Sequence, residues 1–266
     1  MVEKRSRQAR DERSAVLDLG LAETKTLAEC LAVDQAALAR AVLEAMAMRS
    51  EAEELARVAL DAKALGIRRQ MEEIGAALRR LVEGNARRAA VTEALAGHPS
   101  DTVRGWAAFM IGRSEEPRLI PQRLMDMRPF AADHHFAVRE WSWMAVRSEI
   151  AAHLGPAIAC LTGWTADPDP NVRRFAVEST RPRGVWCTHI EELKEHPALG
   201  APLLDPLCAD RDQYVRKSVA NWLNDASKSR PKWVKATCAR WAKSGDARTL
   251  WIVKRALRTL DKKEGA

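Results

Sequence analysis

Three acidic side chains, Glu140, Glu178 and Asp225, stand at related places in segments that share a Val-Arg pair near the start of a predicted helix. Counted from the valine of each segment, the acids lie at offsets of 2, 6 and 10 residues. A step of four residues rotates about 40° around a helix and advances about 6 Å along its axis. The acids would follow a shallow diagonal across neighbouring helices, where carboxylates can stabilise a developing cation or position a water molecule.

The same acids also have an ordinary interpretation as surface ion pairs. Arg174 and Glu178 are four residues apart, a spacing that gives a helix pair worth about 0.2–0.5 kcal/mol. Two tryptophans, Trp143 and Trp186, favour a binding site instead, because an aromatic face beside acids and arginines can stack on a base and hold a positive charge. Both interpretations stay open, since the twist between helices decides whether the acids converge.

A repeat positions these residues. Val-Arg pairs begin at Val103, Val138, Val172 and Val215, at intervals of 35, 34 and 43 residues, and Ile252 takes the valine position in a fifth helix. This period with two helices per unit is typical of HEAT-like repeats. Each valine, with its neighbours three, four and seven residues later, makes an apolar stripe that would be buried between layers. We predict an all-α, HEAT-like repeat α-solenoid, a right-handed superhelix with a concave face.

The segment before the repeats is helical as well. It holds no proline before Pro99, and residues 31–48 and 67–84 have the apolar spacing of amphipathic helices, with helix punctuation at 33–36 and 84–85. We divide the chain into an N-terminal helical region (1–97) that packs on or extends the solenoid, the repeat region (98–262) and a short tail (263–266). Residues 185–188 are the one short strand candidate.

Composition and spacing exclude several classes. With 47% hydrophobic and 30% charged residues the chain is globular, and no run of eighteen apolar residues predicts a membrane span. The charged N-terminus is no secretory signal, so we expect a cytoplasmic protein. Five scattered cysteines make no disulfide framework and are expected to be small apolar side chains.

The spacing of glycine and histidine excludes further chemistry. No two of the 13 glycines lie closer than seven positions, which excludes a P-loop, a dinucleotide-binding turn and a nucleophile elbow. Adjacent His134 and His135 point about 100° apart on a helix, a poor geometry for chelation, and no zinc motif is present. Nucleotide, zinc and serine-hydrolase chemistry are therefore all disfavoured.

Basic charge is concentrated at one end of the chain. Residues 211–266 carry 15 basic and five acidic side chains, a net charge of +10, although the whole chain has a net charge of only +7. Such a segment suits a polyanionic partner or forms a solvated basic face.

Four segments carry a family resemblance: HFAVREWSWMAVR, DPDPNVRRFAVESTRPRGVW, YVRKSVANWLNDASKSRP and TLWIVKRALRTL. They resemble motifs of the AlkC branch of the AlkD-like DNA alkylation repair glycosylases over roughly residues 98–262. No motif of that family is found in residues 1–97. Many members carry an immunoglobulin-like domain after the repeats, and we expect none in this chain.

The resemblance implies a monofunctional DNA glycosylase that hydrolyses the N-glycosidic bond of cationic alkylated bases such as 3-methyladenine and 3-methylcytosine, in base excision repair. The resemblance implies neither a metal nor a cofactor. The partner would be double-stranded DNA, bound by the concave face of a monomer, and this DNA would associate the cytoplasmic protein with the nucleoid. The acids that surround the lesion in the family match Glu140, Glu178 and Asp225, and its lesion-contacting tryptophan matches Trp186. We expect Glu178 and Asp225 to flank the sugar and the attacking water, and Glu140 to hold the lesion or its neighbouring arginine.

Phosphate contacts would come from basic residues on the repeat helices and in the C-terminal part. Pro182 should end its helix and aim Arg181 and Arg183 outward. The predicted DNA-binding residues are Arg139, Arg173, Arg174, Arg181, Arg183, Lys217, Lys228, Arg230 and Lys254.

Two other functions compete with the glycosylase. A catalytically silent HEAT-repeat protein could bind nucleic acid through the same basic groove. A protein-interaction scaffold, a common use of HEAT repeats, predicts no salt-dependent DNA binding and leaves the acids and the nine tryptophans unexplained.

Overall fold

The computed structural model of the protein describes residues 11–84, 86–112 and 119–264, and every regular element in these ranges is a helix. The chain forms two compact units. The first contains residues 1–117 and 133–145, and the second contains residues 118–132 and 146–266. The prediction of an all-α protein is therefore confirmed. The last two residues of the predicted tail lie outside the described ranges, and the final helix extends to Glu264.

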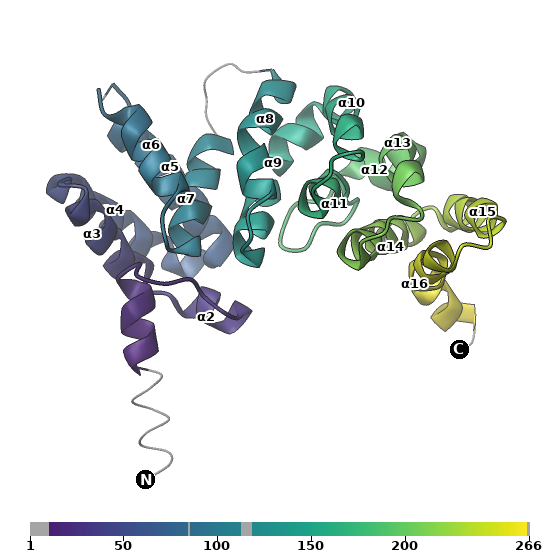
Figure 1. The fold of residues 1–266 in the computed structure, drawn as a ribbon, viewed down its shortest axis with the longest axis horizontal. Helices are drawn as coiled ribbons and strands as arrows, with labels where there is room; N and C mark the ends of the chain where they lie inside the picture. Colours follow the sequence, from purple (N-terminus) through teal and green to yellow (C-terminus); the bar gives the residue numbers. More distant parts are fainter. Residues whose placement is uncertain (1–10, 85, 113–118, 265–266) are drawn as a thin grey trace, which may run out of the picture. The chain divides into compact units, whose positions relative to one another are not determined.

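In the first unit, residues 11–18 are helical, and the elements that follow are α2 (Leu27–Ala32), α3 (Gln35–Ala45), α4 (Arg49–Asp61), η1 (Ala62–Leu65), α5 (Ile67–Val82), α6 (Arg88–Ala96), α7 (Asp101–Gly112) and the first ten residues of α9 (Phe136–Ala152). Within this unit α3 packs on α4, and α7 packs on both α5 and α6 (Figure 1).

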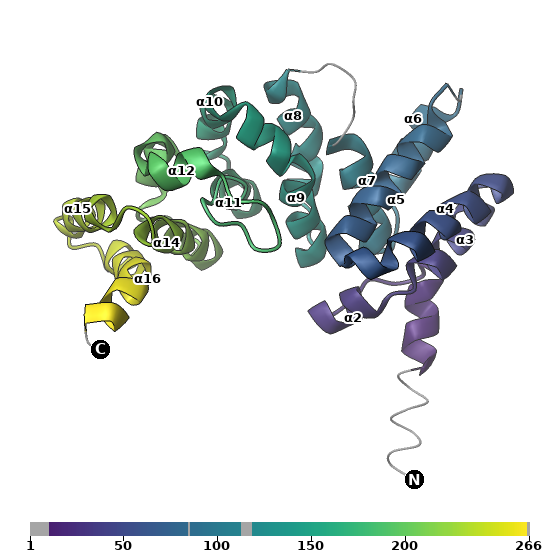
Figure 2. The same ribbon diagram turned by 180° about the vertical axis from the view of Figure 1, so that it is seen from behind.

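The second unit contains α8 (Ile120–Ala131), the rest of α9, α10 (Leu154–Trp164), α11 (Pro170–Glu178), α12 (Glu191–Glu195), η2 (Pro197–Gly200), α13 (Ala201–Leu204), η3 (Asp205–Leu207), α14 (Gln213–Ser227), α15 (Pro231–Ala242) and α16 (Ala247–Glu264). Here α14 packs against α11 on one side and α16 on the other, as both views show (Figures 1 and 2).

The helices of the N-terminal region follow the predicted punctuation. The helix predicted over residues 67–84 is α5. The one predicted over residues 31–48 is interrupted at Asp34, whose side chain accepts hydrogen bonds from the backbone of Ala36 and Ala37 and so begins α3.

The apolar stripe of the repeat is buried as predicted. Val103, Val138, Val172, Val215 and Ile252 each have 0% of their surface exposed.

The arginine of each Val-Arg pair has a constant structural role. Its Nη1 donates to the two main-chain carbonyls five and six residues earlier, in the turn that precedes its own helix, at Arg104, Arg139, Arg173 and Arg216. Carbonyls of a turn have no ladder partner, and the two N–H groups of Nη1 satisfy both of them. In each Val-Arg pair the valine is therefore buried between helix layers, and the arginine stabilises the turn before its helix.

The same arginine also joins one repeat to the next. Nε and Nη2 of Arg104 contact Asp133 at 2.8 and 3.2 Å, and the same atoms of Arg173 contact Asp210 at 2.7 and 3.0 Å. Both aspartates lie in the turn of the following repeat. A two-bond contact between an arginine and an aspartate forms only at one relative position of the two groups. Each ion pair therefore constrains how its helix stacks on the next one.

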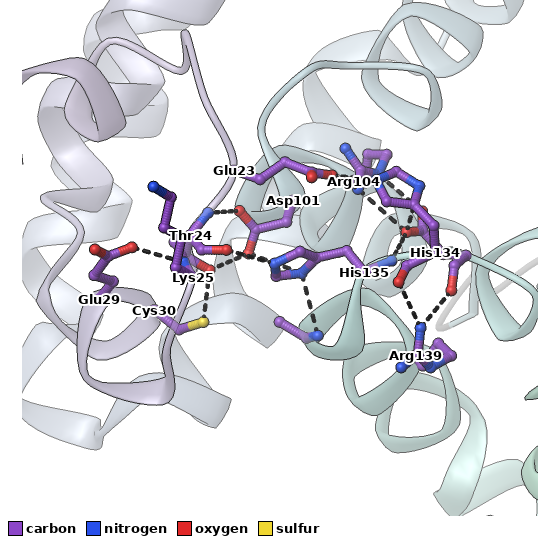
Figure 3. Close-up of polar contacts among 12 residues, drawn as sticks. Glu23, Thr24, Lys25, Glu29, Cys30, Asp101, Arg104, His134, His135 and Arg139 are labelled. Carbon is purple, nitrogen blue, oxygen red and sulfur yellow. Dashed lines mark hydrogen bonds and ion pairs between the residues drawn. The ribbon is translucent and has the colours of Figure 1, made fainter. Parts of the chain in front are cut away.

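Figure 3 shows a buried polar network that ties residues 23–30 to α7 and to the start of α9 in the first unit. Asp101 accepts hydrogen bonds from the backbone N–H and hydroxyl of Thr24, both at 2.8 Å. Nε2 of His135 donates to the carbonyl of Thr24 at 2.7 Å, while its Nδ1 accepts from the N–H of Ala137 in the first turn of α9. His135 therefore caps the start of α9, and it lies with His134 in the bend before this helix rather than within a helix as expected.

Two smaller features concern strands and membranes. The strand candidate at 185–188 is wrong, because Trp186 has a φ of 60° and the segment forms a turn. Within the ranges that the structure describes, no helix has both the length and the apolar character needed to cross a bilayer.

Candidate active site

Glu178 and Asp225 meet through one arginine. Arg181 donates from Nη1 to Oε1 of Glu178 at 2.7 Å and from Nε to Oδ2 of Asp225 at 2.9 Å. Glu178 is the last residue of α11, and Asp225 lies two turns after Ser218 on α14. Side chains seven residues apart share one helix face, so α14 presents Ser218 and Asp225 to the same neighbour. Ser218 donates to Oε2 of Glu178 at 2.6 Å.

The surroundings keep Glu178 ionised. Burial alone would raise the pKa of this carboxyl, but the charges of Arg174 and Arg181 and the hydrogen bonds from Ser218 and Arg181 outweigh it and lower the pKa. In turn, burial would lower the pKa of Arg181, and the two carboxylates raise it. A carboxylate held in this way is suited to stabilise positive charge rather than to donate a proton.

Further cations surround the acid pair. Nη2 of Arg174 lies 3.7 Å from Oε2 of Glu178, and its guanidinium stacks 4.2 Å from the ring centre of Tyr214. Nζ of Lys228 lies 3.4 Å from Oδ1 of Asp225. Each carboxylate thus has two basic neighbours, whose N–H groups orient it.

An extended segment, residues 179–190, leaves α11 beside this pair, and we call it the α11–α12 loop. It carries Arg181 and Trp186. Three carbonyls of the loop accept hydrogen bonds from the guanidinium of Arg147, and the carbonyl of Thr180 accepts one from the indole of Trp222. Trp186 is 50% exposed and adopts the left-handed backbone region, which a tryptophan rarely enters. The contact of this ring with a lesion or its sugar stays a prediction.

Glu140 and Trp143 lie together in the first unit. The indole Nε1 of Trp143 donates to Oε2 of Glu140 at 2.9 Å, and the Trp143 ring is 1% exposed. From the sequence we expect Trp143 to offer a stacking face. The structure instead buries that ring in the core of its unit, and only its indole N–H meets the Glu140 carboxylate. Trp143 holds the Glu140 carboxylate in place.

The sequence model of the DNA alkylation repair enzyme family matches residues 39–260. That range is well over half of the chain. The chain belongs to the DNA alkylation repair enzyme family.

Three individual proteins are similar to parts of this chain. An uncharacterised protein of Bacillus subtilis (strain 168), YhaZ, is 41% identical over 122 residues, which is 46% of this chain and 34% of that protein. The alkylpurine DNA glycosylase AlkC of Pseudomonas fluorescens, solved with DNA containing an abasic site analogue, superposes with a TM-score of 0.61 at 25% identity. The match covers 79% of this chain and 58% of AlkC. AlkD2 of Streptococcus mutans has the same fold, with a TM-score of 0.58 at 22% identity over 78% of this chain and 97% of that one.

The chain spans about a third of the length of the curated relative that it matches and less than two thirds of AlkC. The family match begins at residue 39, so it includes much of the N-terminal region in which the sequence shows no motif. The separation of residues 1–97 from the repeats stays a prediction.

The basic residues of this DNA alkylation repair family member fall into three groups. Arg139 and Arg173 are the structural arginines of the Val-Arg pairs; the Nη1 of each binds its own turn. Arg174 and Arg181 are buried against the acid pair, so the prediction that Arg181 points outward is wrong: α11 ends at Glu178, before Pro182, and the next turn directs Arg181 inward. The exposed members are Lys217, Lys228, Arg230 and Lys254, and Arg183 is half-buried, with Nη2 on Ser229.

Sequence reasoning missed several neighbours of the acids. Ser218 was assigned to the buried stripe, where its hydroxyl in fact reaches Glu178. Arg258 on α16 donates to Oδ1 of Asn221 at 3.0 Å, and burial, with the charge of Arg255, lowers its pKa. A hydroxyl at an otherwise apolar stripe position is the signal that could have revealed Ser218; Arg258 gave none.

Within residues 11–84, 86–112 and 119–264 no group of three His, Cys, Asp or Glu side chains is placed to hold a metal ion. The titratable groups of the candidate site are two acids and several cations, a donor set that suits a charged organic substrate and a phosphate backbone.

Proposed function

We propose that this chain is a monofunctional DNA glycosylase that releases cationic alkylated bases, with 3-methyladenine as the main substrate and 3-methylcytosine as a second one. The observation that carries the proposal is the pair Glu178 and Asp225. Two successive repeats contribute one of these acids each, and Arg181 joins them. The chain that holds them is a member of the DNA alkylation repair enzyme family.

The chemistry needs little more than this pair. A base alkylated at N3 already carries positive charge, so it leaves without a strong general acid. The remaining task is to stabilise the oxocarbenium-like sugar and to position a water molecule, and ionised carboxylates serve both purposes. The lowered pKa of Glu178 supports its role as a negative charge beside the sugar. We assign Asp225 to the water and Glu140 to the lesion.

The half-exposed Trp186 supports a contact with the cationic base or its sugar, since a cation over an indole face is attracted by the ring. We assign the contacts with the DNA phosphate backbone to five basic residues, of which Arg183 is half-buried and the others are exposed: Lys217, Lys228, Arg230, Lys254 and Arg183. Contacts of this kind are independent of sequence, as a protein that searches for lesions needs. The proposed partner is double-stranded DNA, and the protein acts as a monomer in the cytoplasm.

The test is release of free bases from DNA treated with dimethyl sulfate, measured by chromatography and mass spectrometry for the wild type and Asp225→Asn. We expect the wild type to release 3-methyladenine and the variant to be slower by about 10²–10³-fold. Asp205→Asn is the matched control, because Asp205 binds Arg240 and Trp241 rather than the acid pair. It should keep the wild-type rate. Oligonucleotides with a single 3-methylcytosine test the second substrate.

No release by the wild type, at a salt concentration where DNA still binds, would overturn the proposal. It would favour a catalytically silent nucleic-acid-binding protein, in which Arg181 and the two acids only fasten the repeats together.

A further inference from the structure

Arg147 is a buried cation whose donors are directed at backbone rather than at solvent. It lies on α9 in the second unit, and 3% of its surface is exposed. Burial lowers the pKa of its guanidinium to about 10, so the group is still protonated at neutral pH. Keeping a charged side chain in such a place requires a strong set of hydrogen-bond acceptors around it.

The acceptors are spread along the α11–α12 loop. Nη1 donates to the carbonyl of Ser179 at 2.9 Å, Nη2 to that of Arg181 at 2.6 Å, and Nε to that of Thr188 at 3.1 Å. These three carbonyls lie at both ends of the loop. One planar guanidinium therefore fixes the start, the Arg181 turn and the return of a segment that has no regular structure of its own.

A glycine completes the contact. A Cβ added at Gly184 would lie 2.8 Å from Cζ and 2.9 Å from Nε and Nη2 of Arg147. The loop backbone therefore lies directly on the guanidinium. The hydrogen bond from the N–H of Ile190 to the carbonyl of Pro182, at 3.1 Å, closes the loop around this point.

We propose that Arg147 is a positioning residue of the candidate active site: it sets the conformation of the α11–α12 loop and, through it, the places of Arg181 and Trp186. The role in catalysis rests on the proposed glycosylase function, whereas the role in holding the loop does not. Arg147 touches neither base nor sugar in this scheme. It acts because its bonds to the carbonyl of Arg181 hold the residue that joins Glu178 to Asp225.

The first test measures how readily the loop opens and does not depend on catalysis. Trypsin cleaves after Arg183 only if the loop opens, while the Arg181–Pro182 bond resists it. Under native conditions we expect Arg147→Met to yield fragments 1–183 and 184–266, identified by mass, about tenfold faster than the wild type, because proteolysis follows the population of the locally open state. Arg104→Met is the matched control: it removes a buried arginine that also holds two carbonyls, but in the first unit. It should not promote this cut.

A second variant, which keeps the guanidinium, distinguishes opening of the loop from general unfolding of the protein. Gly184→Ala leaves Arg147 intact but forces the backbone off it, and should also accelerate the cut after Arg183. Arg147→Lys keeps the charge and loses the fork, so it should behave like Arg147→Met. Equal cleavage of the wild type, Arg147→Met and Gly184→Ala, or full protection by Arg147→Lys, would overturn the proposal.

The second test reads the reaction. In single-turnover release of 3-methyladenine, we expect Arg147→Met to slow the step by about 10–100-fold, as a displaced catalytic group does. In an Arg181→Met, Trp186→Ala background the same substitution should add little, because Arg147 acts on the site only through these two side chains. A further loss of the same size in the triple variant would overturn the positioning role. An inactive wild type with a protected loop would instead overturn the proposed function and leave the loop contact standing.

Discussion

The guanidinium of Arg181 contacts the carboxylate of Asp225 across 44 positions of sequence, with Nε 2.9 Å and Nη2 2.8 Å from Oδ2. The same group binds Glu178, three residues earlier. Two repeats therefore contribute one acid each to a site that neither repeat could form alone, and the arginine between them belongs to a loop rather than to a helix. Both the stability and the chemistry of the site should depend on this one side chain.

Removal of Arg181 should destabilise the protein. Arg181→Met leaves two carboxylates buried without their shared partner, and breaking a buried pair in this way costs about 3–5 kcal/mol. Urea unfolding followed by circular dichroism measures the loss. Arg183→Met, which removes one hydrogen bond to Ser229, is the control and should cost about 0.5–1.5 kcal/mol. Equal stabilities for the two variants would mean that the acids do not need Arg181.

The buried Glu178 should make stability fall in acid. Folding lowers its pKa below the ordinary 4.5, so its contribution is fully present above that pH and is lost as the pH falls through the lower, folded value. Urea unfolding from pH 7 to pH 3 should give a stability difference between wild type and Glu178→Gln that is constant above about pH 5.5 and shrinks below it. A difference that grows on acidification would show that burial, not the arginines, controls this carboxyl.

Salt dependence should separate the two kinds of basic residue. Lys217 and Lys254 are exposed, and replacing either by Gln should reduce the slope of log affinity against log salt by about 1. Arg173 binds Asp210 and its own turn, so Arg173→Gln should lower the free energy of unfolding and leave the slope unchanged. Filter binding of undamaged duplex DNA at several salt concentrations measures the slopes. A reduced slope for Arg173→Gln would return that residue to the DNA interface.

The sequence predicted what periodicity controls. Burial of Val138, Val172 and Val215 follows from the spacing of apolar residues, and so does the helical class of the whole chain. The offsets of the acids left open whether Glu178 and Asp225 converge, and the structure joins these two through Arg181. These features depend on contacts within one helix and between neighbouring layers, which a repeat makes regular.

Details of the site depend on a segment without periodicity and were not predictable. Arg181 was expected outside because Pro182 follows it, yet α11 ends earlier and the turn reverses its direction. Trp143 shares a stripe with Glu140 by spacing, but the bulk of an indole is buried when the adjacent face offers a core. The role of Arg147 requires carbonyls 32 to 41 residues later, which no local pattern encodes.

Trp222 packs between Gly200 and the α11–α12 loop, so a larger residue at position 200 should destabilise the protein. Its indole donates to the carbonyl of Thr180 at 3.0 Å, and a Cβ at Gly200 would lie 2.4 Å from its ring carbon Cζ2. Gly200→Ala should push the ring and cost about 1–3 kcal/mol, as overpacking does. Gly163→Ala is the matched control: Gly163 is exposed in α10 with open space at its Cβ, so alanine should gain about 0.5–1 kcal/mol. Urea unfolding of both variants measures these opposite signs, and a neutral Gly200→Ala would show that Trp222 has room to move without releasing Thr180.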